Sequence, residues 1–376
     1  MPAPDDPIAA VSHPEPTLSY AALATAPLSP LPSLGAYVAA GTETVRAVLE
    51  SPLCGVRPPG EPVPAALATG PAGPLFAQLV RMRDDLAREP LKEALERALA
   101  AVDLRRVATV AEAEVEAALG AARPPDARQI DEAVLRAPVA TVARLLGVPA
   151  SDVAQVAGWT RALAAGLAPG ATGAQVAAAH ESVMPLRVAL ADALSAATSL
   201  LPLRTSLEAA GADDEESLAN AIGLLFQTHD ATAALVGATL VALAAEEARC
   251  ARTRDDAAYA QSLVERVVAA TPPVHNTRRF VQRDGRIAGV ALRAGDPIVV
   301  VLAAAVSAHE GCASLAFGAG RHRCPGAALA LTLAAACVRA LLAAGVVPAH
   351  QCSAHSCRPS HNVRLPCFAA TNGGTP

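Results

Sequence analysis

The chain has 376 residues, a formal net charge of −5 and a composition that is 52% hydrophobic but only 2% aromatic. The small negative charge excludes a global electrostatic attraction to nucleic acid or to an anionic membrane surface. Because strands favour β-branched and aromatic residues, a core rich in alanine, valine and leucine predicts a mainly helical fold.

The N-terminal residues 1–33 are rich in proline and are predicted to form an extended lead-in to a single domain over residues 34–376. They hold no basic segment followed by an apolar core, so we expect no signal peptide. The apolar runs near 231–245 and 327–349 are short or interrupted, which predicts buried helices rather than membrane spans. The eight cysteines lack the paired spacing of a small secreted scaffold, which favours a cytoplasmic location.

Strand-like and helical patterns follow one another along the next part of the chain. Residues 36–40 predict a short strand and residues 42–51 a helix. A charged amphipathic helical pattern covers Leu79–Val102, and several alanine-rich helical patterns cover Asp103–Leu203. Farther on, Gly289–Val300 has the pattern of a hairpin of short strands.

A long apolar helix is predicted over Ser217–Arg249, after an acidic turn at 210–216 that suits a helix start. This helix carries one polar cluster, Gln227-Thr228-His229-Asp230-Ala231-Thr232. Polar groups inside such a helix need hydrogen-bond partners or a function. We therefore treat the cluster as part of a candidate site.

The stretch Phe317–Ala330 places one cysteine between glycines and basic residues at the start of an apolar helical run. Gly318 and Gly320 permit backbone conformations closed to other residues, so the loop can fold tightly beneath a flat ligand. Cys324 precedes Pro325, which suits a first helical turn, and the free N–H groups of a helix start favour a thiolate. Such a thiolate is a strong axial ligand for haem iron. The alternative is a glycine-rich loop with a buried free cysteine.

This stretch resembles the haem-binding signature of the cytochrome P-450 family, Phe-Gly-x-Gly-x-His-x-Cys-x-Gly, and matches every fixed position. The resemblance extends over about Leu34 to Phe368. It implies a mainly α, triangular single-chain fold with a small β-rich lobe, haem b (iron protoporphyrin IX) as the cofactor, and Cys324 as the iron ligand. The other residues of this loop that it implies in haem binding are Phe317, Gly318, His322 and Gly326.

The resemblance also implies a monooxygenase that uses O₂ and electrons from a redox partner to oxidise a small organic or natural-product-like substrate. The alternatives are an atypical peroxide-using or non-hydroxylating haem-thiolate enzyme, and a haem-binding protein without turnover. The expected electron donor is a ferredoxin or a similar protein, and no nucleic acid or membrane partner is expected. Four arginines are candidates for a basic proximal face that meets this donor, or for a merely solvated face: Arg81, Arg83, Arg321 and Arg323.

Family members hold the haem propionates with basic residues, and this chain offers several. The family pattern Asp-x-x-x-His-x-x-x-Arg aligns with Asp84 onward, so Arg88 takes the histidine position and Lys92 the arginine position. Because they are four residues apart, one helix face carries both. Arg279 aligns with a propionate arginine of the family, and His322 is the fourth candidate, since such donors pair well with carboxylates. A solvated charged face is the alternative for Arg88 and Lys92.

Two family features behind the cysteine loop are predicted to be absent. The family's Glu-x-x-Arg belongs in the helix at Tyr259–Val274, but alignment from Pro272 places Arg266 at the glutamate and Ala269 at the arginine. The loop that this ion pair helps to lock is also missing, because the chain runs from Ala303 almost directly into the haem loop. Near the C-terminus, Ser360–Pro366 resembles the family's terminal hairpin at the substrate pocket.

The polar cluster of the central helix departs from the family as well. It aligns with Ala-Gly-x-Asp/Glu-Thr-Thr, in which the acid and the first threonine deliver protons during oxygen activation. Asp230 holds the acid position, but Ala231 replaces the first threonine. We hypothesise that Gln227, four residues earlier on the same helix face, supplies the lost polar group. Thr232 is the alternative relay hydroxyl, about 100° round the helix.

A second group of metal-like residues combines His350, Cys352, His355 and Cys357. Their spacing is crowded and lacks the second separated pair of a zinc site. We therefore expect a loop with incidental thiols and imidazoles rather than a zinc site.

Overall fold

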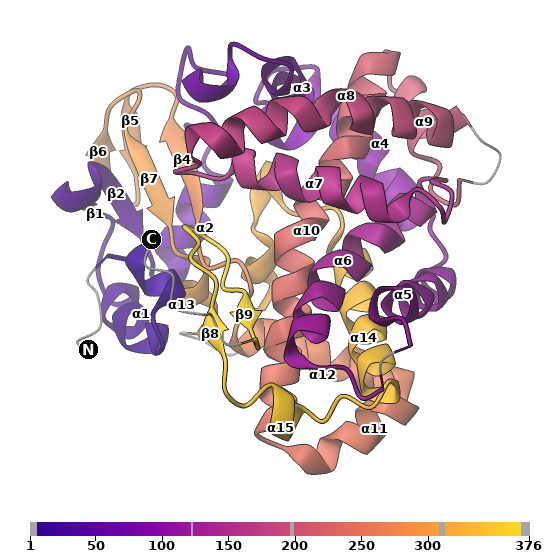
Figure 1. Ribbon diagram of the computed structural model, residues 1–376. Coiled ribbons are helices and arrows are strands. Elements are labelled where there is room, and N and C mark those ends of the chain that lie inside the picture. Colours follow the sequence, from indigo (N-terminus) through magenta and orange to yellow (C-terminus); the bar gives the residue numbers. More distant parts are fainter. Residues whose placement is uncertain (1–5, 122, 196–198, 308–312, 370–376) are drawn as a thin grey trace.

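The computed structural model describes residues 6–121, 123–195, 199–307 and 313–369. A body of helices lies beside a smaller lobe that holds most of the strands (Figure 1). This arrangement confirms the predicted mainly α fold with a small β-rich lobe.

Helices make up most of the elements in the described part of the chain. The α-helices are α1 Pro16–Ala24, α2 Thr42–Glu50, α3 Ala72–Gln78, α4 Arg88–Ala100, α5 Leu104–Leu119, α6 Ala127–Leu145, α7 Val153–Leu167, α8 Gly173–Ser195, α9 Leu203–Glu208, α10 Asp214–Ala244, α11 Cys250–Asp255, α12 Ala257–Ala270, α13 Leu302–Ser307, α14 Ala327–Ala343 and α15 Pro348–Gln351. The 3-10 turns are η1 Ala9–Ser12, η2 Pro32–Leu34, η3 Ala65–Leu67, η4 Val80–Met82, η5 Glu247–Arg249, η6 Ala313–Phe317 and η7 Gly320–His322. The strands are β1 Ser29–Leu31, β2 Ala36–Ala39, β3 Cys54–Gly55, β4 Thr277–Val281, β5 Gly285–Ile287, β6 Val290–Leu292, β7 Pro297–Val300, β8 Ser356–Cys357 and β9 Pro366–Cys367.

Helix α10 is the central element of the helical body, and its sequence explains where it begins. The Asp213 carboxylate accepts the backbone N–H of Glu216 at 2.7 Å, and the Glu216 side chain accepts the N–H of Asp213 in return. This capping box satisfies two of the free donors at the helix start. Helices α6, α7, α8, α12 and α14 pack around α10 (Figure 1), which is why its apolar residues are buried on most sides. The predicted long helix is confirmed, although it ends at Ala244.

The β-rich lobe is built on a five-stranded sheet with the strand order β1-β2-β7-β4-β3. The predicted strand and helix at residues 36–51 are confirmed as β2 and α2. The predicted hairpin over Gly289–Val300 is wrong in its pairing, because β6 pairs with β5 and β7 lies between β2 and β4. The reason is burial: Ile298, Val299 and Val300 of β7 are all 3% exposed or less, which suits an interior strand.

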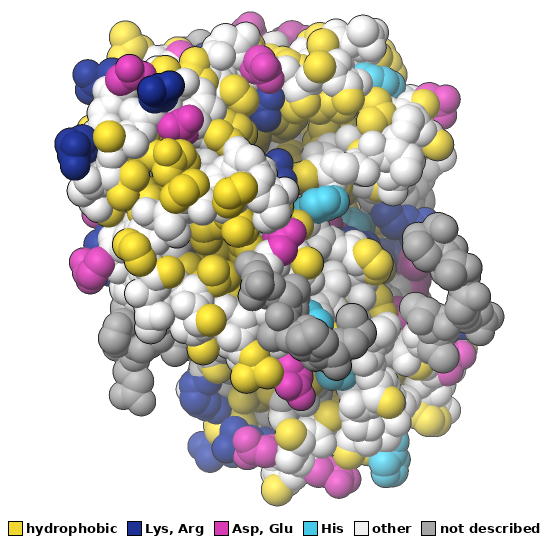
Figure 2. All heavy atoms as spheres, turned by 90° about the vertical axis from the view of Figure 1, so that its left-hand side faces the viewer, with side chains coloured by type: hydrophobic (Ala, Val, Ile, Leu, Met, Phe, Trp, Pro, Cys, Tyr) yellow, Lys and Arg dark blue, Asp and Glu magenta, His cyan; other side chains and the backbone are white. Residues whose placement is uncertain are grey.

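The outer face of this lobe carries charges of both signs. Figure 2 turns the lobe toward the viewer and shows apolar side chains between scattered basic and acidic groups. An open groove of about 830 Å³ runs between Tyr37 and the β5–β6 hairpin, and its charged lining residues are Asp284, Arg286, Arg293 and Asp296. Because the charges alternate, this groove presents no surface of a single sign to a partner.

The N-terminal segment belongs to the lobe rather than leading into it. The described residues 6–33 form η1, α1, β1 and most of η2, so the predicted extended conformation is wrong for them. Val11 is fully buried, and the buried Tyr20 of α1 places its hydroxyl 2.6 Å from Nδ1 of His275. Arg364 holds the same segment from the C-terminal side, because its guanidinium donates to the carbonyls of Val11 and His13. These long-range contacts order a proline-rich stretch that local patterns describe as extended.

One helical segment, which contains α14, is long and apolar enough to span a membrane by length and composition alone. The residues 320–343 have a mean hydropathy of 1.9, but 56% of that window is buried inside the protein. Helix α14 packs against α5, α10 and α12, as the core helix of a globular body does (Figure 1). The prediction of a buried helix at this position is therefore confirmed.

Candidate functional site

The cysteine loop folds as tightly as its glycines allow. Gly318 and Gly320 have φ values of 73° and 65°, in the left-handed region that favours glycine. A Cβ added to Gly320 would lie 2.7 Å from the Leu49 carbonyl oxygen, so no larger residue fits there. The N–H of Cys324 donates to the Phe317 carbonyl at 2.9 Å and closes the loop. Helix α14 begins only at Ala327, so the expected helical position of Pro325 is wrong.

The Cys324 thiol is accessible and yet surrounded by protein. Its residue is exposed, but burial raises its pKa, against the opposing effects of the Gly326 N–H and of Lys92, Arg81 and Arg323. Both properties hold together for a group on the wall of an interior space. The Gly326 N–H and the cations favour the thiolate, as expected from the sequence, but burial opposes them and leaves the pKa raised in the haem-free protein. A bound metal ion would reverse this balance, since it deprotonates a coordinating thiol.

Helix α4 holds the cysteine loop through two cationic side chains. The amphipathic pattern at Leu79–Val102 becomes helical only at Arg88, which is the first residue of α4. Nη2 of the fully buried Arg88 donates to the Arg321 carbonyl at 2.5 Å, and one turn later Lys92 Nζ donates to the Arg323 carbonyl at 2.6 Å. The predicted shared face is therefore confirmed, and in this structure both side chains contact loop carbonyls.

Asp84 ties the same loop to the β-rich lobe. Its carboxylate accepts the Val56 N–H at 2.7 Å and Nε2 of His322 at 2.8 Å. Burial alone would raise the pKa of Asp84, but these two donors and Arg321 hold it below its ordinary value. Burial lowers the pKa of His322 to about 4, although Asp84 opposes the shift. His322 is therefore neutral, with Nε2–H donating to Asp84 and Nδ1 accepting from Arg88 Nη2 at 3.2 Å.

This neutral histidine predicts a pH dependence for the haem-free protein. The pKa of His322 is about 4 in the folded state and 6.5 in the unfolded state, so the unfolded chain binds more protons between these values. The free energy of unfolding should then fall by about 3 kcal/mol as the pH drops through this window. Urea unfolding across the window should show a flatter profile for His322→Gln than for the wild type.

Comparison of variants isolates the His322 contribution, because the buried His275, whose pKa burial lowers to about 3, titrates in both proteins. His350→Gln changes an exposed histidine and serves as the control, with the wild-type profile expected. Equal pH profiles for wild type and His322→Gln would show that His322 is not held neutral by the fold.

Three guanidinium groups gather where the resemblance places the propionates. Burial, with the charges of Arg81 and Arg88, lowers the pKa of Arg279 to about 10, while Cys54 and Asp84 oppose the shift. Nη1 of Arg88 pairs with Glu89 at 2.9 Å, but its buried Nε has no hydrogen-bond partner. Asp84 acts on both Arg88 and Arg279, and its oxygens already accept from His322 and Val56. An excess of buried positive charge with an unused donor suits an anionic ligand.

The space beside the cysteine also fits a flat group. A Cβ added to Gly326 would meet only Leu99, at 4.0 Å, and one added to Gly318 would meet atoms no closer than 3.9 Å. Phe317 is half-buried at the start of the loop. The accessible sulfur, the open space over two glycines and the guanidinium cluster together match an iron porphyrin with its two carboxylates.

The polar cluster on α10 is held mainly by its own helix and by the C-terminal hairpin. Nε2 of Gln227 donates to the Gly223 carbonyl at 2.7 Å, and Oγ1 of Thr228 donates to the Leu224 carbonyl at 2.8 Å. Asp230 lies 2.7 Å from Nδ1 of His229 and also accepts from Arg358. Burial would raise the pKa of Asp230, but these two partners hold it below its ordinary value.

A partly exposed stripe runs along this otherwise buried helix. Leu224, Gln227, Thr228 and Ala231 have accessible surface, and their spacing puts them on one face. Thr232 is buried, at 3% exposed, and lies off this stripe. The stripe therefore supports Gln227 rather than Thr232 as the polar group on the same helix face as Ala231.

Helix α12 contains the positions at which the resemblance would place Glu-x-x-Arg. In α12 Arg266 donates to Ser262 Oγ at 2.6 Å, and Glu265 accepts from Gln261 at 3.0 Å. Both charged residues are exposed, and within the described residues neither joins an ion pair. Helix α13 is followed closely by η6, while residues 308–312 of the shortened connection lie outside the described residues.

Two of the four arginines that were candidates for the basic proximal face have acidic partners. Arg83 pairs with Asp85 at 2.8 Å and with Glu216 at 2.6 Å, and Arg321 pairs with Glu89 at 2.7 Å. Arg81 is exposed, and its guanidinium carbon lies 5.8 Å from the centre of the Phe226 ring of α10. It belongs to η4, outside α4, so it does not continue the face of that helix.

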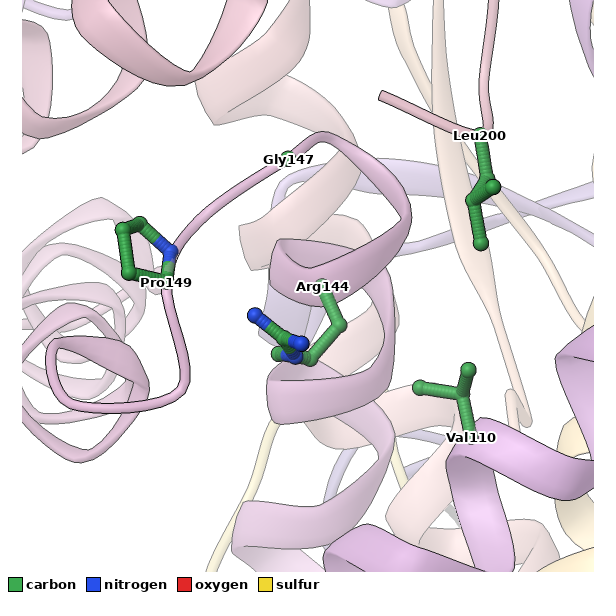
Figure 3. A pocket seen from close by; sticks show the side chains of 5 residues that line it. All are labelled: Val110, Arg144, Gly147, Pro149 and Leu200. Atoms are coloured by element: carbon green, nitrogen blue, oxygen red, sulfur yellow. The ribbon is translucent and has the colours of Figure 1, made fainter. Parts of the chain in front are cut away.

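Two other candidate regions lie apart from the cysteine loop. Among the described residues no three His, Cys, Asp or Glu side chains are placed to hold a metal ion, and Cys352 is fully buried. A pocket of about 260 Å³ is lined by Val110, Arg144, Gly147, Pro149 and Leu200 (Figure 3). Its one charge, Arg144, already lies 3.8 Å from Glu114. This small pocket offers no chemistry beyond a mostly apolar contact.

Comparison with known proteins gives matches in sequence and in structure, although no family model matches the chain. It is 32% identical over 256 residues to the cytochrome P450 monooxygenase PikC of Streptomyces venezuelae, a match over 63% of this chain and 60% of that protein. It is 27% identical over 241 residues to the cytochrome P450 CYP105Q4 of Mycobacterium marinum, over 59% of this chain and 57% of the relative. The chain thus matches about three fifths of the length of these curated relatives.

Two crystal structures illustrate the agreement in fold. CalO2 aligns with a TM-score of 0.76 at 21% identity and covers 96% of each chain. P450BioI, solved in complex with an acyl carrier protein, aligns with a TM-score of 0.75 at 17% identity, over 93% of this chain and 96% of that one. The described helices and strands therefore have the arrangement seen in these proteins.

Proposed function

We propose that this chain is a cytochrome P450, as its sequence relatives and its fold suggest, and that it acts as a haem-thiolate monooxygenase. In this proposal it uses O₂ and electrons from a redox partner to oxidise a small organic or natural-product-like substrate. The observation that carries the proposal is the accessible Cys324 sulfur, which accepts the Gly326 N–H and lies near buried guanidinium groups. Haem b, when bound by Cys324, would supply the oxygen activation, and thiolate ligation would favour cleavage of the O–O bond.

The protein's own part begins with holding the cofactor. Cys324 provides the iron ligand, and Phe317, Gly318 and Gly326 border the open space beside it. Arg279 and the free Nε of Arg88 are the donors best available to the propionates. Lys92 already binds the Arg323 carbonyl and Glu96, and His322 already binds Asp84 and Arg88. Each would reach a propionate only by exchanging those partners. Their role is first to keep the cysteine loop in place.

The distal residues move protons and exclude water. Asp230 stays ionised between His229 and Arg358, and the side chain of Arg358 is 35% exposed, which connects this acid with the solvent. Gln227 keeps its amide oxygen free of partners among the described residues while its nitrogen bonds Gly223. We assign to that oxygen the polar role that the family gives to the threonine replaced by Ala231. Thr232 remains the second candidate for this role.

Replacing Gln227 with alanine tests this assignment. General acid–base groups contribute factors of about 10² or more, so we expect product formation per electron to fall by about tenfold or more, with electrons diverted to peroxide. The measurement is product, peroxide and electron consumption in one assay. Thr228→Ala removes a hydroxyl that only bonds Leu224 and should leave coupling near the wild-type value. Unchanged turnover and coupling in Gln227→Ala would remove Gln227 from the mechanism.

The partner and the location follow from the same proposal. We infer a ferredoxin or a similar protein as the electron donor, acting in the cytoplasm. Arg83 and Arg321 have acidic partners of their own, whereas the exposed Arg323 has no ion pair among the described residues. We therefore expect docking of the donor to meet few unpaired charges on the proximal face. Steady-state rates with the donor should then vary only weakly with ionic strength.

The decisive experiment is spectroscopic. The purified protein is loaded with haem, reduced and exposed to CO, and the thiolate-type shift of the Soret band is the expected result. A folded protein that takes up no added haem would overturn the proposal. Turnover with O₂ and a reductase system, compared with peroxide alone, then separates the monooxygenase from a peroxide-using enzyme, and no turnover with either would leave only haem binding.

A further inference from the structure

The segment that contains Arg81 is attached to the N-terminal third of α10. The side chain of Asn220, which is 5% exposed, accepts the Val80 N–H at 3.0 Å and donates to the Gln78 carbonyl at 3.1 Å. On the next turn Leu79 packs so closely against Gly223 that an added Cβ would lie 2.8 Å from its methyl group. These contacts fix the backbone immediately before Arg81.

From that position the Arg81 side chain lies between the distal helix and the cysteine loop. Its guanidinium carbon is 5.8 Å from the centre of the Phe226 ring of α10. Burial lowers the pKa of Arg81 while the Cys324 sulfur opposes the shift, and the charge of Arg81 in turn acts on Arg279. By accessible surface Arg81 is an exposed residue, as Cys324 is. Both side chains are therefore open to a ligand, and they lie within electrostatic range of each other.

Arg81 has no neutralising partner among the described residues. Among the described residues its guanidinium contacts the ring of Phe226, which carries no charge. Arg83, two residues later, binds both Asp85 and Glu216. The Asp84 carboxylate, three residues later, is already used by His322 and Val56. A guanidinium without an anion is well suited to bind a carboxylate through two hydrogen bonds. The site therefore lacks one negative charge opposite Arg81.

We propose that Arg81 binds a carboxylate inside the site, which rests on the proposed haem-thiolate function. Two sources carry this chemistry: a haem propionate, and an acidic group of the substrate. In the first case Arg81 is a cofactor residue beside Arg279. In the second it selects acidic substrates and orients them from the distal side, because it contacts the helix that bears Gln227 and Asp230.

The test compares Arg81→Gln with the wild type in two binding titrations. In the first, haem-free protein is titrated with haem and with haem dimethyl ester, whose propionates carry no charge. In the second, the haem-loaded ferric protein is titrated with dodecanoate and with its methyl ester, and the Soret band reports binding. A weakening of about tenfold for the charged ligand only, as expected for a lost charge-assisted contact, supports the proposal. The titration that changes names the source.

Controls separate this result from misfolding and from failure of the proposed function. Arg83→Gln removes a paired arginine of the same segment and should leave both titrations unchanged. Arg81→Lys keeps the charge and should recover part of the affinity, and it replaces Arg81→Gln if that variant fails to fold. If the wild type takes up no haem, the proposed function fails, and Arg81 is then tested by the thermal shift that dodecanoate, but not its ester, produces in the haem-free protein. Equal affinities of wild type and variant in every titration would overturn the proposal.

Discussion

The Cys324→Ala protein is expected to lose the thiolate-type CO spectrum completely and to bind haem at least about tenfold more weakly. In the described loop the Cys324 sulfur is the accessible group that accepts the Gly326 N–H, and alanine offers the iron no ligand. Because burial keeps this thiol protonated in the haem-free protein, haem binding should also release a proton from the wild type. The measurements are the reduced CO spectrum and proton release on haem addition to both proteins.

Cys357→Ala is the matched control, since it removes a partly buried thiol from the C-terminal hairpin. It should keep both the spectrum and the proton release. A thiolate-type spectrum in Cys324→Ala would mean that another cysteine binds the iron, and the proposed site would then be misplaced.

Asp84→Ala is expected to destabilise the haem-free protein by about 3 kcal/mol and to loosen the cysteine loop. The substitution leaves two buried donors, the Val56 N–H and Nε2 of His322, without an acceptor, at about 1–3 kcal/mol each. It also removes the carboxylate that partly balances Arg88 and Arg279, so their mutual repulsion grows. Urea unfolding gives the stability, and the rate of Cys324 modification by a thiol reagent reports the loop.

The neighbouring Asp85 supplies the control for this experiment. Its side chain is 51% exposed and pairs with Arg83, so Asp85→Ala should cost less than about 1 kcal/mol and leave the thiol rate unchanged. Equal effects of the two alanine substitutions would contradict the view that Asp84 anchors the loop.

The Asp84 result bears on how this chain manages without the ion pair that family members place behind the cysteine loop. Here α12 contributes only exposed, locally bonded charges at the aligned positions. The loop is held instead from the other side, by Asp84, Arg88 and Lys92, which bind its histidine and its carbonyls. Loss of one anchor is tolerable where a second set of contacts restrains the same backbone.

Several features of this site follow from local sequence. The glycine positions in the cysteine loop, the shared face of Arg88 and Lys92, and the capping of α10 at Asp213 each depend on residues a few positions apart. Backbone conformation and helical spacing decide such features, so a single chain suffices to predict them. The identity of Cys324 as the thiol beside the open space belongs to the same class.

Other features depend on partners that are distant in the sequence, and the predictions of these features were wrong or missing. The predicted helix is broken before Arg88, and Arg81 contacts the ring of Phe226, 145 positions later, a partner that the local pattern does not indicate. Strand β7 pairs with β2 rather than with its neighbour β6, and Tyr20 orders the N-terminal segment against His275. Local patterns carry no information on which buried partner a side chain or strand will meet.

The sequence by itself determined a glycine-rich turn that places Cys324 shortly before a helix, and the sulfur of this residue is the atom that we propose as the iron ligand. Only the tertiary structure decided the state of that atom and its surroundings. Burial raises the Cys324 pKa above what the N–H groups and cations would set, and packing brings Arg88 and Arg279 together beside Asp84, with Glu89 as the ion-pair partner of Arg88. Desolvation and charge proximity are properties of three-dimensional packing, which spacing along the chain does not express.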